Sequence, residues 1–306
     1  MSDLMRSPPA HLRAAMLMLA STLTFGLMAV VIRLASADLA TTEIAFFRNL
    51  FGMLALLPLV LRPGKPLPAT RHLPRYLLRT LIGLVSMLCG FWAIGHLPLS
   101  QAVSLSYSTP LFVTIAAALW LGEQVRMRRW AAVVAGFIGV LIILRPGTAS
   151  FSPGMLVAVL AAVMGALVAI QIKQLARVDS PDTVVFYTYV FWVPMSLLPA
   201  LFQWTWPHGV MWLWLVLTGV FGTLGQLLWT RALKLGEVSA LQPISFMQLP
   251  IVILFGWWLF DETLDLWTGV GAAVILGANA YIAHREAVLA RRAASEAPTA
   301  AAKPGE

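Results

Sequence analysis

Two charged residues inside one apolar segment are the first candidates for chemistry in this chain. Glu43 and Arg48 lie in the run 41–61, and a charge at membrane depth costs several kcal/mol unless it faces protein or water. Five residues separate them, about 7.5 Å along a helix axis, a distance that the long Arg side chain can span. We interpret Arg48 as a gate or an anchor for an anion, with Glu43 as the acid best placed to carry a coupled proton. The alternative is an Arg that bonds helix-end carbonyls or extends to lipid headgroups.

Hydrogen-bonding side chains also crowd two apolar segments, each just before a proline. Lipid would not tolerate such a density of polar groups, so both segments are expected to face the protein interior. Matched interruptions of helices in two halves of a chain are typical of a transport site, because broken helices expose backbone groups to substrate. The alternative is that the hydroxyls only hold helices together and the prolines only kink them. The residues are Ser104 and Tyr107 before Pro110, and Gln242 and Gln248 before Pro250.

Aromatic and amide side chains at a second pair of places would suit a flat, partly polar organic solute. Trp92 lies in the run 77–96, and Gln226 and Trp229 lie at the comparable place in 209–230. The competing interpretation puts the tryptophans in the aromatic belts that mark membrane interfaces. Lys173 either attracts an anionic substrate or extends its ammonium group to the headgroups.

The chain lacks the parts of several other functional classes. It has no Gly-x-x-x-x-Gly-Lys phosphate loop, no Gly-x-Ser-x-Gly elbow and no pair of histidines at His-x-x-x-His spacing. With a single cysteine, Cys89, it can form neither an internal disulfide nor a multi-cysteine metal site. We therefore expect no enzyme activity, no cofactor and no metal.

The elements that must position these residues are membrane helices. Hydrophobic residues make up 59% of the 306 positions and charged residues only 11%, against about 25% charged in soluble domains. The +8 net charge is explained by short basic loops, so no nucleic-acid partner is expected. Apolar runs fall at 14–35, 41–61, 77–96, 99–121, 129–146, 153–175, 182–203, 209–230, 239–260 and 266–283. The sequence thus predicts an all-α integral membrane protein with ten transmembrane helices.

The second half of the chain repeats the first with the loop charges reversed. Leu-Gly-Glu ending at Glu123 is followed by three arginines, whereas Phe-Asp-Glu ending at Glu262 lies among acids. Lys and Arg concentrate on the cytoplasmic side. If the chain crosses ten times with both tails inside, only Arg33, Arg48 and Arg145 of the 21 basic residues face the outside. This predicts two inverted five-helix repeats, 14–147 and 148–287, in the cell membrane. Cytoplasmic tails precede and follow them at 1–13 and 288–306, the last without apolar periodicity and predicted to be disordered.

These features resemble the EamA-type branch of the drug/metabolite transporter superfamily. The resemblance rests on the helix ends at Glu123 and Glu262, the prolines Pro110 and Pro250, and the Gly-rich fifth and tenth helices. Shorter stretches, Glu43 to Arg48 and "LSYSTPLF" from residue 105, are similar to members that move S-adenosylmethionine or riboflavin. The resemblance implies a carrier that moves small organic solutes without hydrolysing ATP.

We therefore expect a secondary active transporter that moves a small organic metabolite by alternating access. Its cavity would be lined by helices one, three, four, six, eight and nine, and a proton or an exchanged solute would provide the coupling. An amino-acid or drug exporter of the same architecture is the first alternative, and a membrane-embedded enzyme or a channel is the second. Substrate, direction, coupling ion and oligomeric state are left open by the sequence.

Overall fold

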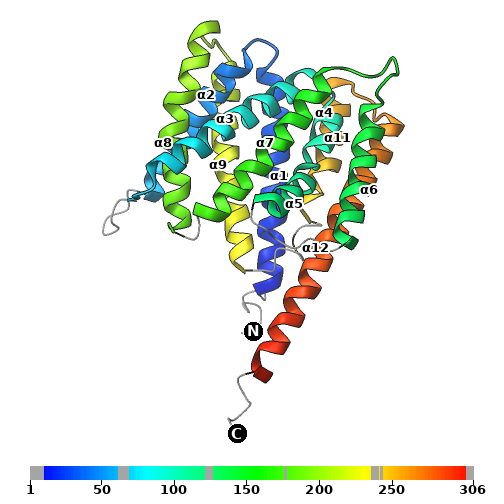
Figure 1. Ribbon diagram of the computed structural model, residues 1–306. Coiled ribbons are helices and arrows are strands. Elements are labelled where there is room, and N and C mark those ends of the chain that lie inside the picture. The colour runs from blue at the N-terminus through cyan, green and yellow to red at the C-terminus, as the bar shows by residue number, and fades with distance from the viewer. Residues whose placement is uncertain are drawn as a thin grey trace, which may run out of the picture.

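The computed structural model describes residues 10–60, 69–120, 127–175, 178–235, 241 and 244–300, and within these ranges it is helical with no strand. The helices form one bundle (Figure 1). They are α1 (Ala10–Ala35), α2 (Thr41–Val60), α3 (Leu73–His96), α4 (Leu99–Ser106), α5 (Thr109–Trp120), α6 (Met127–Leu144), α7 (Gly154–Leu175), α8 (Pro181–Ala200), the 3-10 turn η1 (Leu201–Gln203), α9 (Met211–Leu235), α11 (Gln248–Phe260) and α12 (Leu266–Ala300).

Ten segments of the bundle account for ten membrane crossings. Eight helical segments of the described chain are long and apolar enough to span a bilayer, with α4 and α5 counted as one segment, Leu99–Trp120. The twenty-residue α2 and the shorter apolar α11 complete the ten. The predicted fold class, an all-helical membrane protein of ten helices in two repeats, is confirmed.

The main helix contacts follow a two-fold pattern in which a contact made by one half has a counterpart made by the other. Helix α1 packs along α9, and α7, the first helix of the second half, packs along α3. Helices α6 and α12, the last of each half, pack against each other, so this contact is its own counterpart. A Cβ added to Gly139 would lie 2.8 Å from the Gly271 carbonyl oxygen, and one added to Gly271 would lie 2.6 Å from the Gly139 oxygen. The Gly-rich fifth and tenth helices, α6 and α12, therefore cross backbone to backbone.

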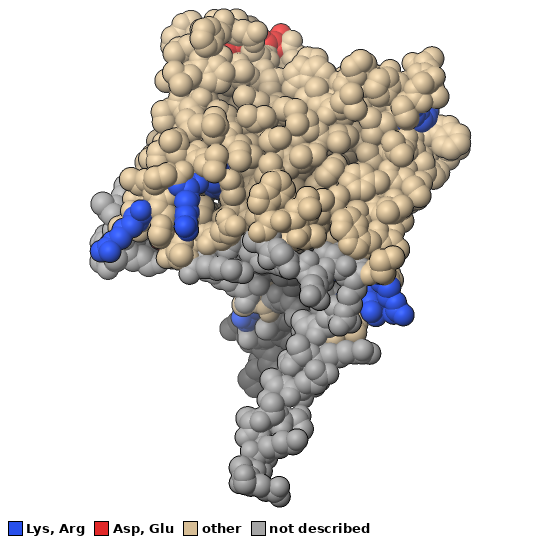
Figure 2. All heavy atoms as spheres, viewed as in Figure 1, with Lys and Arg blue, Asp and Glu red and all other residues tan. Residues whose placement is uncertain are grey.

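Exposed charge gathers at the two ends of the bundle. We call the end where α1 begins and α12 ends the terminal end and the other the far end (Figure 1). In the view of Figure 2, blue basic groups lie mostly at the terminal end, acidic atoms lie at the far end, and the band between them carries almost no charge. Large apolar side chains are exposed along this band, among them Leu77, Leu81, Ile138, Leu141, Leu198, Leu213 and Leu254.

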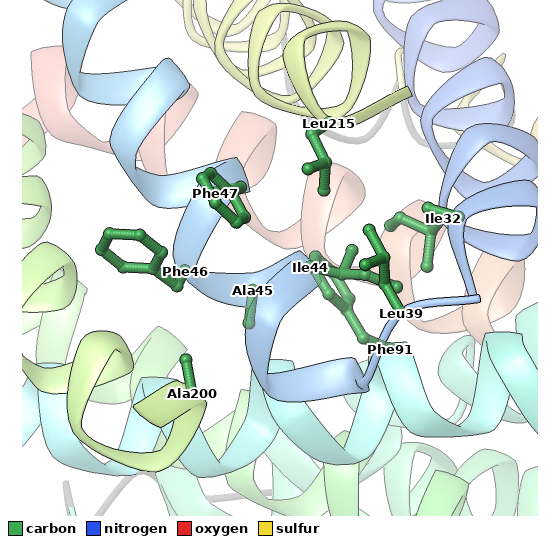
Figure 3. Packing of buried hydrophobic residues seen from close by; sticks show 10 residues of the cluster. Ile32, Leu39, Ile44, Ala45, Phe46, Phe47, Phe91, Ala200 and Leu215 are labelled. Carbon is green, nitrogen blue, oxygen red and sulfur yellow. The ribbon is translucent and has the colours of Figure 1, made fainter. Parts of the chain in front are cut away.

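A buried apolar cluster holds the far half of the bundle together (Figure 3). Phe46 and Phe47 of α2 point toward the ends of α8 and α9, where Trp204 lies 5.8 and 5.5 Å from their ring centroids. Ile32 of α1 is fully buried in the same cluster. The cluster fixes α2 against both halves of the chain.

Helix α12 extends well beyond the bundle and differs from the sequence prediction. It continues to Ala300 (Figure 1), into the segment 288–306 for which disorder is expected; residues 301–306 lie outside the described part. The segment is rich in Ala and Arg, which have high helix propensity. Because α12 is already formed inside the bundle, adding residues to its end requires no new nucleus.

Candidate functional site

The fourth crossing is broken where the sequence places its polar residues. Helix α4 ends at Ser106 and α5 begins at Thr109, and Pro110 in the first turn of α5 has no N–H to continue the ladder. Side-chain hydroxyls take up carbonyls at the break: Ser106 Oγ donates to Val103 O at 2.7 Å and Ser108 Oγ donates to Leu105 O at 2.6 Å. The local sequence Ser-Tyr-Ser-Thr-Pro therefore both breaks the helix and satisfies the break.

The corresponding crossing in the second half has a matching break. Residues 246 and 247 form a turn, and α11 begins at Gln248 with Pro250 in its first turn. The two breaks meet, because Tyr107 Oη donates to the Ser245 carbonyl at 3.1 Å and the Tyr107 ring contacts the Phe246 ring edge-on. Gln248 faces α1, with its Cγ 3.8 Å from a Cβ added to Gly26. Gln242 lies outside the described residues.

Other candidates fall at separate places in the bundle. Ser104 is buried and donates to Ser100 O within its own helix at 2.6 Å. Trp92 stacks on His96 with centroids 4.3 Å apart, and both line a cavity of about 560 Å³ at the far end, between α1, α2, α3 and α7. Gln226 is half-buried on α9, and Trp229 is 40% exposed. The backbone of Lys173 lies in α7, and its side chain lies outside the described part.

Glu43 and Arg48 are not joined by an ion pair in the described chain. The Glu43 carboxylate is fully buried at the start of α2 and accepts hydrogen bonds from Thr205 N at 2.6 Å, from Thr205 Oγ1 and from Ala40 N at 3.0 Å. It fastens α2 to the loop between α8 and α9. Arg48 turns instead toward α8, where its Cζ lies 5.6 Å from the ring centroids of Tyr189 and Trp192.

A charged cluster joins several helices at the far end of the bundle. Glu262 accepts from Leu99 N at 2.7 Å and pairs with Arg33 at 3.3 Å. The Arg33 guanidinium also donates to the Ile94 and Leu97 carbonyls at the end of α3, where the helix dipole favours a cation. We call Arg33, Glu262 and the Leu99 N–H the far-end pin, since they join α1, α3, α4 and the α11–α12 loop.

The local sequence explains how Glu262 reaches this position. Asp261 adopts a left-handed conformation, with φ 52°, directly after α11, which Asp tolerates better than most residues. The Glu262 N–H then bonds back to the Gly256 carbonyl at 3.0 Å, so the chain folds back onto the last turn of α11. A Cβ on Gly256 would approach Glu262 Oε2 to 3.1 Å, so the glycine leaves room for the carboxylate.

Sequence reasoning missed three residues near Arg48: Arg79, Tyr189 and Trp192. Arg79 was left among the basic residues on the cytoplasmic side, but α3 begins at Leu73 and the Arg79 side chain is 6% exposed inside the bundle. The signal was present, because Arg79 stands in an apolar stretch as Arg48 does. The aromatic pair gave no such signal, since its place beside the arginines depends on how α8 packs against α2 and α3.

Comparison with known proteins matches this chain to a family of transporters and to individual transporters. The model of the EamA-like transporter family matches residues 12–145 and 152–283. A riboflavin transporter of Vibrio cholerae is 33% identical over 286 residues, which cover 92% of this chain and 96% of that protein. An S-adenosylmethionine uptake transporter of Rickettsia felis is 31% identical, with 80% and 83% covered. The pseudopaline exporter CntI of Pseudomonas aeruginosa is 29% identical, with 84% and 90% covered.

A solved crystal structure shares the fold. It matches with a TM-score of 0.62 and 20% sequence identity, over 91% of this chain and 98% of that chain. The same helical architecture is thus adopted by distantly related sequences.

Proposed function

The chain belongs to the EamA-like transporter family, and from this premise we propose that it is a secondary carrier working by alternating access on a heteroaromatic metabolite of the riboflavin type. Membership and the named relatives make it a multi-pass, non-enzymatic transporter of a small metabolite. Mechanism, substrate and orientation are the proposal. Riboflavin is the first solute to test, because the match to the Vibrio cholerae riboflavin transporter covers nearly all of both chains. S-adenosylmethionine is the second.

The observation that supports this most strongly is the meeting of two broken helices, one from each half. Tyr107 at the α4–α5 break bonds the Ser245 carbonyl just before the turn at 246 and 247. A third helix joins them, since Asn279 Nδ2 of α12 donates to the Tyr107 carbonyl at 2.7 Å. Broken helices that meet between inverted halves are where carriers of this architecture bind their solutes. We place the solute beside Tyr107, with Gln248 and Gln226 as amide partners.

Alternating access requires two ends that close in turn. In the proposed cycle the far-end pin holds the far end closed, and beside it Leu99, Val103, Leu249 and Val252 form a buried apolar layer with Ala29. In the proposed cycle the halves rock about the α6–α12 crossing, the pin separates, and the layer opens. Because Lys and Arg concentrate on the cytoplasmic side of a membrane, we propose that the basic terminal end faces the cytosol of a cell whose inner membrane holds the carrier.

Flux measurements on purified protein in liposomes test this function. A carrier gives saturable riboflavin uptake that is accelerated by riboflavin on the opposite side, whereas a channel gives flux that does not saturate. An enzyme would return a chemically altered solute. Tyr107→Phe removes only the hydroxyl that bonds Ser245, so we expect insertion to be unaffected and flux to fall. If neither riboflavin nor S-adenosylmethionine shows saturable counterflow, the proposed substrate class is refuted.

A further inference from the structure

Two arginines from different helices lie against one indole ring inside the bundle. The Cζ of Arg48, on α2, lies 5.6 Å from the Trp192 ring centroid, and the Cζ of Arg79, on α3, lies 5.3 Å from it. Helices α2, α3 and α8 gather at one side of the molecule (Figure 1). Tyr189, one turn before Trp192 on α8, provides a second ring for Arg48 at 5.6 Å.

The hydrogen-bonding capacity of these guanidinium groups is largely unused. Arg79 is 6% exposed, and its Nε and Nη1 atoms are buried with no hydrogen-bond partner. The buried Nε of Arg48 also lacks a partner, and its Nη1 donates to Asn49 Oδ1 at 3.0 Å. A buried donor without a partner costs about 1–3 kcal/mol, and more when it is charged. Contacts with rings offset only part of this cost.

No carboxylate in the described residues neutralises the pair. Glu43, on the same helix as Arg48, is engaged by Thr205 and Ala40. Asp179 accepts from Tyr76 Oη at 2.9 Å and from Thr70 Oγ1 at 2.6 Å. Two positive charges therefore lie against one indole ring without a counter-ion from the described chain.

The surroundings of the arginines are held in place by specific contacts. Trp192 Nε1 donates to the Thr80 carbonyl at 2.9 Å, which fixes the ring between α3 and α8. A Cβ on Gly83 would lie 2.9 Å from that ring, and one on Gly222 would lie 3.1 Å from the Arg48 guanidinium. Glycines thus allow α3 and α9 to approach closely without displacing either group.

We propose that Arg48 and Arg79 form a binding site for an oxyanion, the phosphate or carboxylate group of a bound molecule. A guanidinium presents a planar fork of donors that matches both groups, and charge-assisted hydrogen bonds are the strongest available to it. An oxyanion would satisfy the unpartnered nitrogens and neutralise the pair. The oxyanion comes either from a soluble molecule or from a lipid headgroup, because α3 also exposes Leu77, Leu78 and Leu81 to the bilayer.

Thermal unfolding of the full chain in a phosphate-free maltoside detergent tests the site independently of transport. Phosphate, pyrophosphate and citrate are titrated at constant ionic strength against chloride, and phosphatidylglycerol is added in a separate series. We expect one series to raise the unfolding midpoint, since a ligand that binds only the folded state stabilises it. A response to the soluble anions identifies a soluble ligand, and a response confined to the lipid identifies a headgroup.

The variants Arg79→Gln and Arg48→Gln separate a binding role from a structural one. Each should weaken the apparent affinity for the anion by roughly 10-fold or more. Without anion, Arg79→Gln should unfold at a higher temperature than the parent, because it removes a buried charge without a partner. Arg75→Gln, an exposed arginine one turn earlier on α3, is the control for a general loss of charge. If Arg79→Gln does not fold, Arg79→Lys retains the charge but not the fork, and its anion response should be reduced.

Two results would overturn the proposal. One is a parent protein whose midpoint follows ionic strength alone in every series. The other is a variant whose midpoint shifts with the anion or lipid as much as that of the parent. The variant is Arg79→Gln, or Arg79→Lys if Arg79→Gln does not fold.

Discussion

Removal of the Glu262 carboxylate should shift the conformational equilibrium of this protein toward a state open at the far end. Glu262 accepts from the Leu99 N–H at 2.7 Å and pairs with Arg33 at 3.3 Å. These contacts join helices of both halves. In the proposed cycle these contacts exist only while the far end is closed, so Glu262→Ala should remove stabilisation from that state alone.

The structure sets the size of the expected shift. The Arg33 and Glu262 side chains are 23% and 14% exposed, so water screens the pair only in part. Hydrogen bonds to charged groups contribute about 1.5–3 kcal/mol. With about 1.4 kcal/mol for each tenfold change in an equilibrium constant, Glu262→Ala should raise the open population roughly 10- to 150-fold. Glu262→Gln still accepts from Leu99 and should have a smaller effect.

Cysteine modification measures this population. In a background with Cys89 replaced by alanine, Val103→Cys places a thiol in the apolar layer beside the far-end pin, where Val103 is 4% exposed. A membrane-impermeant thiol reagent reaches this position only when the layer opens. When opening precedes labelling, the rate of modification follows the open population, and it should rise in Glu262→Ala by the factor above.

A second ion pair at the same end provides the matched control. Arg145 and Asp265 are 2.6 Å apart, but they join α6 to α12, which stay together in the proposed cycle. The Asp265 side chain is 42% exposed, and surface pairs of this kind contribute little. Arg145→Ala should leave the labelling of Val103→Cys unchanged. Equal labelling rates in Glu262→Ala and the parent would refute the pin as a gate.

Three further predictions concern topology, packing and coupling. Single cysteines at Met127 and Leu264, both exposed, should be labelled from opposite sides of the membrane after the native cysteine is replaced; labelling from one side would contradict the inverted repeat. Gly271→Leu should lower the unfolding midpoint, with an overpacking cost of about 1–3 kcal/mol, whereas Gly277→Ala meets nothing within 4 Å and should not. Glu43→Gln should lower the midpoint because the carboxylate accepts three hydrogen bonds, but should leave the pH dependence of flux per folded molecule unchanged. A flattened pH profile would instead make Glu43 the proton carrier.

The helices and their number follow from local properties of the sequence. Apolar runs of bilayer length specify the crossings whatever lies beside them, because every backbone group in lipid must be satisfied within its own helix. The position of the α4–α5 break is equally local, since Pro110 removes a donor and the nearby hydroxyls take up the freed carbonyls. The helical extension of α12 to Ala300 was not predicted, because a composition without apolar periodicity was interpreted as disorder although its helix propensity is high.

The grouping of the candidate residues depends on tertiary contacts. The sequence suggested that Glu43 and Arg48 meet on one helix, but Glu43 bonds Thr205, which is 162 residues away, and Arg48 turns to α8. Arg79 and Trp192 come together because α8 packs against both α2 and α3.

The sequence by itself determined the ten crossings, the inverted repeat and the places where helices break, since each depends on residues within one turn or on charges beside a membrane. Only the tertiary structure decided which polar groups find partners. Apolar faces that contact lipid and apolar faces that contact protein have the same composition, so the sequence does not specify which helices meet. In this protein that choice pairs Glu262 with Arg33 and leaves two arginines beside one indole ring with nitrogens free to bind.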